Sequence, residues 1–275
     1  MLSNPPDLLV DLRVFIVQFF LTILMRISIY EIIQEAISLF KTNYKLFLSL
    51  SLLGSLLSIL MTGLNGMVNL NSGLNIVALI AGILFLLYFS IRIQIALVIA
   101  VNNRYQQFET SVLECYQTAG SYFWSYILTC LTLGLLIILP IVLIFLSISL
   151  EAPIYITVIA AVVFGSITLL LIYFFNFAPI LNILNPEVES NFSRSKELVE
   201  RNPILVVKML FIGLLTQLLI YFIVDLFISH TYIMGISLAT IMEFFIGLFL
   251  SPLFVSVFIM VYYQLQNDHG VLEDG

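Results

Sequence analysis

Charged residues are scarce in this chain: Asp, Glu, Lys and Arg together make up 9% of its 275 residues. A soluble domain usually carries about 25% charged residues. The charges present are therefore too few to cover the surface of a water-soluble globule of this size, whereas hydrophobic residues reach 61%. The composition excludes an ordinary soluble domain and indicates a chain whose apolar surface is solvated by lipid.

Cysteine and histidine are also scarce, with two residues of each. Cys115 and Cys130 allow at most one disulfide, and we interpret both as reduced structural thiols. His230 and His269 are too few for a metal site rich in histidine. No metalloprotease, serine-hydrolase, phosphate-loop or CxxC motif is present. We therefore expect no catalytic site, no metal and no cofactor.

Basic residues are limited to ten Lys and Arg. Proteins that bind nucleic acids carry a dense basic patch, so we expect no nucleic-acid partner. Strong recruitment to anionic lipid is not supported either, because it usually takes a cluster of about four or more positive residues.

Long apolar runs dominate the sequence instead. A helix of about 20 residues spans the roughly 30 Å hydrocarbon core of a bilayer. Six runs are long enough: about Leu46–Thr62, Asn75–Val101, Trp124–Ser149, Pro153–Leu184, Ile204–Ser229 and Leu238–Leu265. They predict an all-α polytopic membrane protein whose six transmembrane helices form three hairpins.

An amphipathic helix is predicted before each hairpin. In the first, Ser28 and Glu31 have the spacing of a capping box, and six apolar residues share one face: Ile29, Ile32, Ile33, Ala36, Ile37 and Phe40. Ser111 and Glu114 repeat that cap before the second hairpin. We expect all three helices to lie at the cytoplasmic membrane interface.

The predicted units start roughly every 80 residues, which indicates three pseudo-repeats at about 28–101, 111–184 and 186–265. The third unit is predicted to open with Asn185 as helix cap and Pro186 at the first helical position. Residues 26–266 would form the membrane domain, followed by a short cytoplasmic tail at 267–275. Residues 1–25 are interpreted as an apolar interfacial extension. A seventh span and a true start at Met25 are the alternatives.

Positive charges are predicted to lie on one side of the membrane. The residues near the amphipathic helices include Arg26, Lys41, Lys45, Arg92, Arg104, Arg194, Lys196, Arg201 and Lys208. The opposite connections, at 63–74, 150–152 and 230–237, contain no Lys or Arg. The positive-inside rule then places the amphipathic helices and both termini in the cytoplasm. The predicted location is the inner or plasma membrane.

Two carboxylates form the main candidate polar site. Asp225 and Glu243 flank the last connection at equal distance from residue 234, so they are predicted to lie at similar depth on adjacent helices. Facing each other, they could share a proton or hold a cation, with His230 nearby. The alternative is that both are simply hydrated near the outer surface.

Five residues are predicted to anchor the protein at the membrane interface. Arg92 and Lys208 are close enough to the end of a span for their long side chains to reach the headgroups. Trp124, Tyr262 and Tyr263 fit an aromatic belt.

Prolines and amides within the spans are predicted to shape the bundle. Kinks are expected at Pro140, Pro179 and Pro252. Interhelical hydrogen bonds are expected from Gln94, Gln217, Asn176 and Asn182.

The layout resembles the membrane domain attached to some bacterial glycerophosphoryl diester phosphodiesterases. An interfacial helix like that at 27–44 precedes paired spans, and Arg194–Leu198 looks like the family's Arg-Ser-x-x-Leu segment. Val261–Gln266 resembles its aromatic-Tyr-Asp-Leu-Arg ending, although Gln264 and Gln266 replace the acidic and basic residues. The resemblance implies a stand-alone membrane domain without the family's separate catalytic domain, and therefore no phosphodiesterase activity.

The sequence as a whole favours a non-enzymatic membrane protein with a lipid-associated or scaffolding role. Its expected partners are membrane lipids, with another membrane or cytoplasmic protein as a further candidate. A small transporter or channel that uses intramembrane carboxylates is the alternative, because transporters are often built from repeats.

Overall fold

The computed structural model describes residues 29–67, 73–150, 153–186, 190–228, 232–233 and 236–267. The predicted N-terminal extension and most of the predicted tail lie outside these ranges. The described part is almost entirely helical, which confirms the all-α prediction. Its helices are α2 (Ile29–Thr42), α3 (Tyr44–Met67), α4 (Gly73–Tyr105), α5 (Val112–Ser149), α6 (Ile154–Phe175), α7 (Ala178–Leu184), α8 (Asn191–Arg201), α9 (Pro203–Ile228) and α10 (Leu238–Asn267).

A short antiparallel ribbon lies in the predicted connection between α9 and α10. Its two strands are β1 (Tyr232–Ile233) and β2 (Ile236–Ser237), and Tyr232 pairs with Ser237. Apart from this ribbon, the backbone hydrogen bonds of the described elements are helical. That arrangement lets a segment cross lipid without unpaired backbone groups.

Five helical segments in the described ranges are long and apolar enough to cross a membrane, as expected of a multi-pass membrane protein. They are Leu79–Tyr105, Val112–Ser149, Ile154–Leu184, Pro203–Ile220 and Phe244–Gln266. The remaining predicted span, Leu46–Thr62, belongs to α3. Among the described side chains of α3, the apolar stretch is Tyr44–Leu57.

The predicted boundary at Trp124 is wrong, because α5 runs without a break from Val112 to Ser149. The second amphipathic helix and the third span form one helix of 38 residues, about 57 Å long. The segment from Val112 to Trp124 contains no proline, and its one glycine, Gly120, weakens a helix without removing a backbone hydrogen bond. The predicted cap is confirmed, since Ser111 and Glu114 form a reciprocal capping box.

The predicted fourth span is interrupted in the structure. Asn176 and Phe177 separate α6 from α7, and Pro179 lies in the first turn of α7. A proline inside a helix lacks the N–H donor and clashes with the carbonyl four residues earlier. Pro140 and Pro252 do not have this effect, because α5 and α10 continue through them.

The predicted start of the third amphipathic helix is also wrong. Asn185 ends α7, because its backbone N–H donates to the Leu181 carbonyl (2.9 Å). Ser190 caps α8 instead, and its Oγ accepts from the Ser193 N–H (3.4 Å). The predicted stop at Asn202-Pro203 is confirmed, since α8 ends at Arg201 and α9 starts at Pro203.

The buried core lies where the short helices meet one end of the long ones, a region that we call the base. Its buried residues come from α2, α3, α4, α5, α7, α8, α9 and α10, and include Ala36, Phe47, Ile95, Ala119, Leu181, Leu198, Val206 and Val261. The apolar faces predicted for the amphipathic helices are turned into this base. Ile32 of α2, Cys115 of α5 and Val199 of α8 are all buried there. Whether these helices also touch lipid headgroups stays a prediction.

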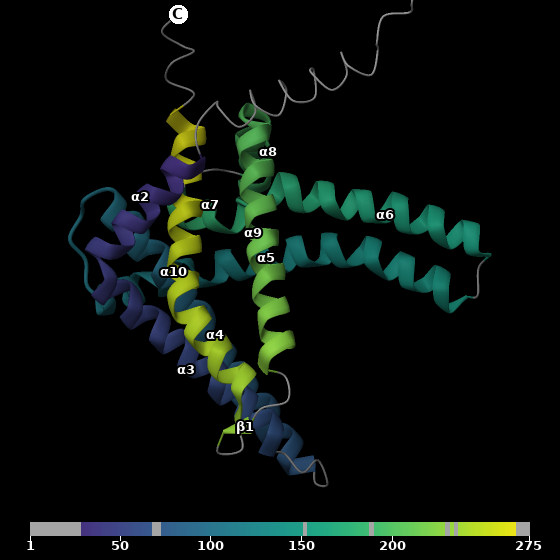
Figure 1. The fold of residues 1–275 in the computed structure, drawn as a ribbon, viewed down its shortest axis with the longest axis horizontal. Helices are drawn as coiled ribbons and strands as arrows, with labels where there is room; N and C mark the ends of the chain where they lie inside the picture. The colour runs from purple at the N-terminus through teal and green to yellow at the C-terminus, as the bar shows by residue number, and fades with distance from the viewer. Residues whose placement is uncertain are drawn as a thin grey trace, which may run out of the picture.

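The long helices extend from the base in different directions. In Figure 1, α5 and α6 run side by side away from the other helices, across the direction of α9. None of the residues of α6 is buried. A helix that is apolar all round and buries no residue in protein fits a lipid environment.

Glu197 lies on the polar face of α8 between two arginines. Arg194 Nη1 donates to its carboxylate (2.8 Å), and Arg201 does so as well. These two hydrogen bonds hold the pKa of Glu197 below its usual value of 4.5. A lowered folded-state pKa means that the stabilisation is present above the unfolded value and lost as the pH falls through the folded one.

We expect the melting temperature of the purified protein to fall as the pH is lowered from about 5 to about 3, and Glu197→Gln to reduce that fall. Glu200→Gln is the matched control, because Glu200 pairs with Lys196 at 3.6 Å and both side chains are more than half exposed. Thermal unfolding in detergent across this range measures the difference. Equal pH profiles for Glu197→Gln and the unmodified protein would contradict it.

Candidate functional site

The predicted carboxylate site falls outside the described side chains. Asp225 and Glu243 belong to α9 and α10, but the structure does not describe their side chains or any part of His230. The pairing of these residues stays a prediction. Among the described residues, no three His, Cys, Asp or Glu side chains gather as a metal site would require.

Arg92 joins α4 to α5. Its Nη2 donates to the Tyr116 carbonyl (2.8 Å) and its Nη1 to the Tyr88 hydroxyl (3.0 Å). The guanidinium also lies over the Tyr116 ring, 4.2 Å from the ring centroid, in a favourable cation–π contact. Gly120 leaves room for this arrangement, because a Cβ there would lie 3.0 Å from Arg92 Nη2. Arg92 is thus held by protein groups, and its predicted role as a membrane anchor is not tested.

The other predicted anchors lie in different surroundings. Trp124 is 71% exposed on α5, where lipid can reach it, and Lys208 is half-buried near the start of α9. Tyr262 is only 4% exposed and packs inside the base. The Tyr263 hydroxyl donates to Asn102 Oδ1 (2.8 Å), which joins α10 to α4.

Asn182 forms a polar network within the base, which confirms its predicted interhelical hydrogen bonds. Its Nδ2 donates to Thr129 Oγ1 (2.7 Å), and its Oδ1 accepts from Ser125 Oγ (2.6 Å) and from Asn191 Nδ2. Three helices, α5, α7 and α8, therefore meet at one buried amide. Such a network fixes how the helices pack, because an unpaired buried amide is costly.

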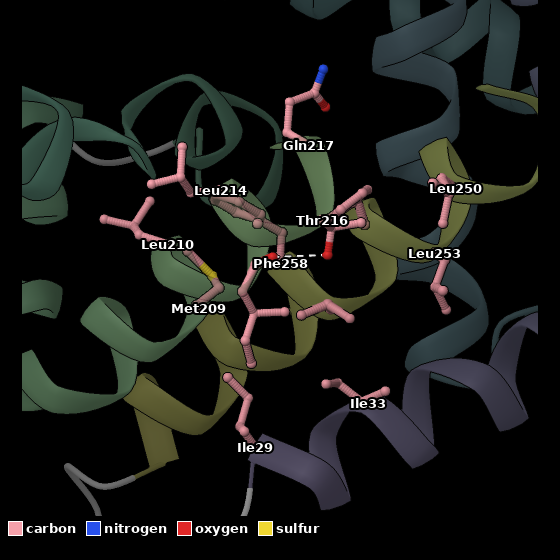
Figure 2. Close-up of a pocket in the computed structure, with 14 residues that line it drawn as sticks. Ile29, Ile33, Met209, Leu210, Leu214, Thr216, Gln217, Leu250, Leu253 and Phe258 are labelled. Atoms are coloured by element: carbon pink, nitrogen blue, oxygen red, sulfur yellow. Dashed lines mark hydrogen bonds between the residues drawn. The ribbon is translucent and has the colours of Figure 1, made fainter. Parts of the chain in front are cut away.

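An apolar groove of about 480 Å³ lies between α2, α9 and α10 (Figure 2). Its lining consists of Ile29, Ile33, Met209, Leu210, Ile212, Gly213, Leu214, Thr216, Gln217, Leu250, Leu253, Phe254, Val257 and Phe258. Thr216 and Gln217 are the polar members. Thr216 Oγ1 donates to the Ile212 carbonyl (2.8 Å), so its hydroxyl is satisfied within α9. Figure 2 shows the Gln217 amide directed away from Ile29 and Ile33.

A smaller cavity of about 170 Å³ lies between α3, α4 and α10, and we call it the polar niche. It is lined by Ser51, Gly54, Ser55, Ser90, Ile93, Gln94, Leu97, Gly247 and Ser251. Its lining contains hydroxyl and amide groups and no charged side chain.

Sequence reasoning singled out Gln94 in the niche and missed the serines. The available signal was a spacing of four residues between small or polar positions. This spacing separates Ser51 from Ser55, Ser90 from Gln94 and Gly247 from Ser251, so it places each pair on one helix face.

We expect Gly120→Ala to leave the protein about 1 kcal/mol less stable than Gly134→Ala does. The added methyl group displaces the Arg92 guanidinium and weakens its bond to the Tyr116 carbonyl. Gly134→Ala is the matched control on the same helix, because a Cβ there meets no atom within 4 Å. It should be neutral or slightly stabilising. Thermal or denaturant unfolding in detergent compares the two variants, and a Gly120→Ala protein as stable as Gly134→Ala would contradict the prediction.

Comparisons with protein families, with curated proteins and with solved structures found no match for this chain. The function is therefore inferred from the molecule itself. The described residues provide five helices able to cross a membrane, a base held by polar contacts, an apolar groove and a polar niche.

Proposed function

We propose that this protein is a non-enzymatic, lipid-associated membrane protein that holds an acyl chain of a membrane lipid in the groove between α2, α9 and α10. The groove carries the proposal. Its volume of about 480 Å³ falls in the range of roughly 300–1,000 Å³ that is typical of small-molecule sites. Such sites are mostly apolar, and twelve of the fourteen lining residues here are apolar or glycine.

The position of the groove favours an acyl chain as the occupant. Its α9 and α10 residues fall within Pro203–Ile220 and Phe244–Gln266, two of the segments able to cross a membrane. At that depth the surrounding medium is hydrocarbon. An empty groove would forfeit the van der Waals contacts of its walls, and a lipid chain restores them.

The proposal includes six spans, with α3 as the sixth, arranged as three hairpins. The basic residues Arg104, Arg194 and Arg201 lie at or near the base, so the positive-inside rule orients the base toward the cytoplasm. Both termini would then be cytoplasmic, and the protein would belong to the inner or plasma membrane. The resemblance to the membrane domain of glycerophosphoryl diester phosphodiesterases agrees with this arrangement and stays a prediction.

If the protein has six spans, α5 and α6 must both cross the bilayer. Transmembrane helices tilt by at most about 40° from the bilayer normal, whereas Figure 1 shows this pair running across the direction of α9. In a bilayer the pair must therefore turn toward the other long helices.

Filling the groove tests the lipid proposal. Gly213 lines the groove, and a Cβ there meets no atom within 4 Å, so Gly213→Leu adds apolar volume at the groove wall. We expect crosslinking to a phospholipid with a photoactivatable acyl chain to fall at least about threefold. Mass spectrometry of the lipid-modified peptides of α9 and α10 measures the yield.

Gly165→Leu is the matched control, because Gly165 lies on α6, outside the groove, and also has no atom within 4 Å of a Cβ. It should leave the crosslinking of the groove peptides unchanged. If Gly213→Leu keeps its melting temperature and the full crosslinking yield, the groove does not hold a lipid chain.

A reporter fused after Gly275 tests the orientation. We expect a reporter that works only in the cytoplasm to be active there, and one that works only outside to be silent. The fusion should remain in the membrane pellet after an alkaline wash and be released by detergent. The opposite reporter pattern would reverse the proposed orientation.

A further inference from the structure

Ser51 is a buried hydroxyl without a partner at the wall of the polar niche. Its side chain is 6% exposed, and no described residue forms a hydrogen bond with its Oγ. A buried hydroxyl is normally paired, because removal from water without a replacement bond is costly. The niche into which it opens offers the space for such a partner.

Other hydroxyls in the apolar helices are paired within their own helix. They donate to the carbonyl four residues earlier, as do Thr132, Ser166, Thr168, Thr216 and Ser256. Ser51 makes no such bond to the Phe47 carbonyl. Its hydroxyl is therefore an unpaired polar group on a residue that lines the niche.

Under the proposed topology the niche lies at the cytoplasmic end of the hydrocarbon core, close to the depth of Arg92. Ser51 follows Lys45 by six residues, or about 9 Å of helix, and Gln94 precedes Arg104 by ten residues, or about 15 Å. No charged side chain lines the niche, so a charged ligand would lose its hydration without compensation. Serine hydroxyls both donate and accept, which suits an uncharged group that does the same.

We propose that the polar niche binds an uncharged alcohol, with the Ser51 hydroxyl as its buried partner. The cavity of about 170 Å³ has room for about five water molecules at roughly 30 Å³ each, and so for an organic group of similar size, such as a glycerol unit. The alcohol comes from the glycerol part of a neutral lipid or from a free polyol. Gln94 and Ser251 are exposed at the edge of the niche, where such a group can enter.

This proposal rests on the proposed membrane location but not on the acyl groove, whose lining shares no residue with the niche. The Gly213→Leu experiment and the experiment on the niche can therefore fail separately. A failed reporter or alkaline-wash result would instead affect the membrane assignment.

Thiol protection in the intact chain tests the niche. Ser55→Cys places a thiol at its wall, and the rate of N-ethylmaleimide labelling is followed by mass spectrometry in phosphatidylcholine nanodiscs, so that Cys115 and Cys130 are read separately. One arm adds free glycerol, and the other includes diacylglycerol in the nanodiscs. We expect at least one arm to slow labelling about threefold or more. Ser193→Cys, exposed on α8, should label at an unchanged rate in both arms.

Ser51→Ala in the Ser55→Cys background identifies the buried partner. We expect the concentration needed for protection to rise about fivefold, the effect of losing one hydrogen bond. Protection by diacylglycerol alone assigns a lipid source, protection by glycerol alone assigns a free polyol, and both results support the proposal. It is overturned if neither arm protects, if the thiol fails to react without additives, or if Ser51→Ala leaves protection unchanged.

Discussion

Several polar groups that lipid tails cannot hydrate are paired with one another where the helices meet. Arg92 donates to the Tyr116 carbonyl, and the Asn182 Oδ1 accepts from Ser125 and Asn191. Ser195 Oγ donates to the Phe174 carbonyl (2.7 Å). Lipid tails offer no competing hydrogen bonds, so pairing between protein groups is favoured. These contacts set the relative positions of α4, α5, α6, α7 and α8, and the base is built around them.

The base leaves much of the long helices without protein cover. Apolar side chains gain little from packing on each other in a bilayer, because lipid tails are equally apolar. Helices can therefore diverge once the polar contacts end, as α5 and α6 do in Figure 1. Both cavities lie along α10, the groove between it and α2 and α9, and the niche between it and α3 and α4. Pro252 is located between Ser251 of the niche and Leu253 of the groove.

The cavities could not be predicted from the sequence, although several of their residues were noticed. The groove joins Ile33, Gly213 and Leu253, and the niche joins Ser51, Gln94 and Ser251. In each set the members are far apart in the chain, so their proximity depends on how three helices pack. The four-residue spacing on each helix marks a face but does not say which face it meets.

The helical, apolar character of this chain can be predicted from its sequence alone. Hydropathy, the Ser111 capping box and the helix stop at Asn202-Pro203 each depend on residues that are close together in the chain. Tertiary structure decided the rest. The chain breaks between α6 and α7 beside Pro179, whereas α5 and α10 continue through Pro140 and Pro252. At the break between α6 and α7, the Ser195 hydroxyl of α8 donates to the Phe174 carbonyl. Whether an interruption is tolerated depends on a partner from elsewhere in the chain, and only the folded molecule supplies it.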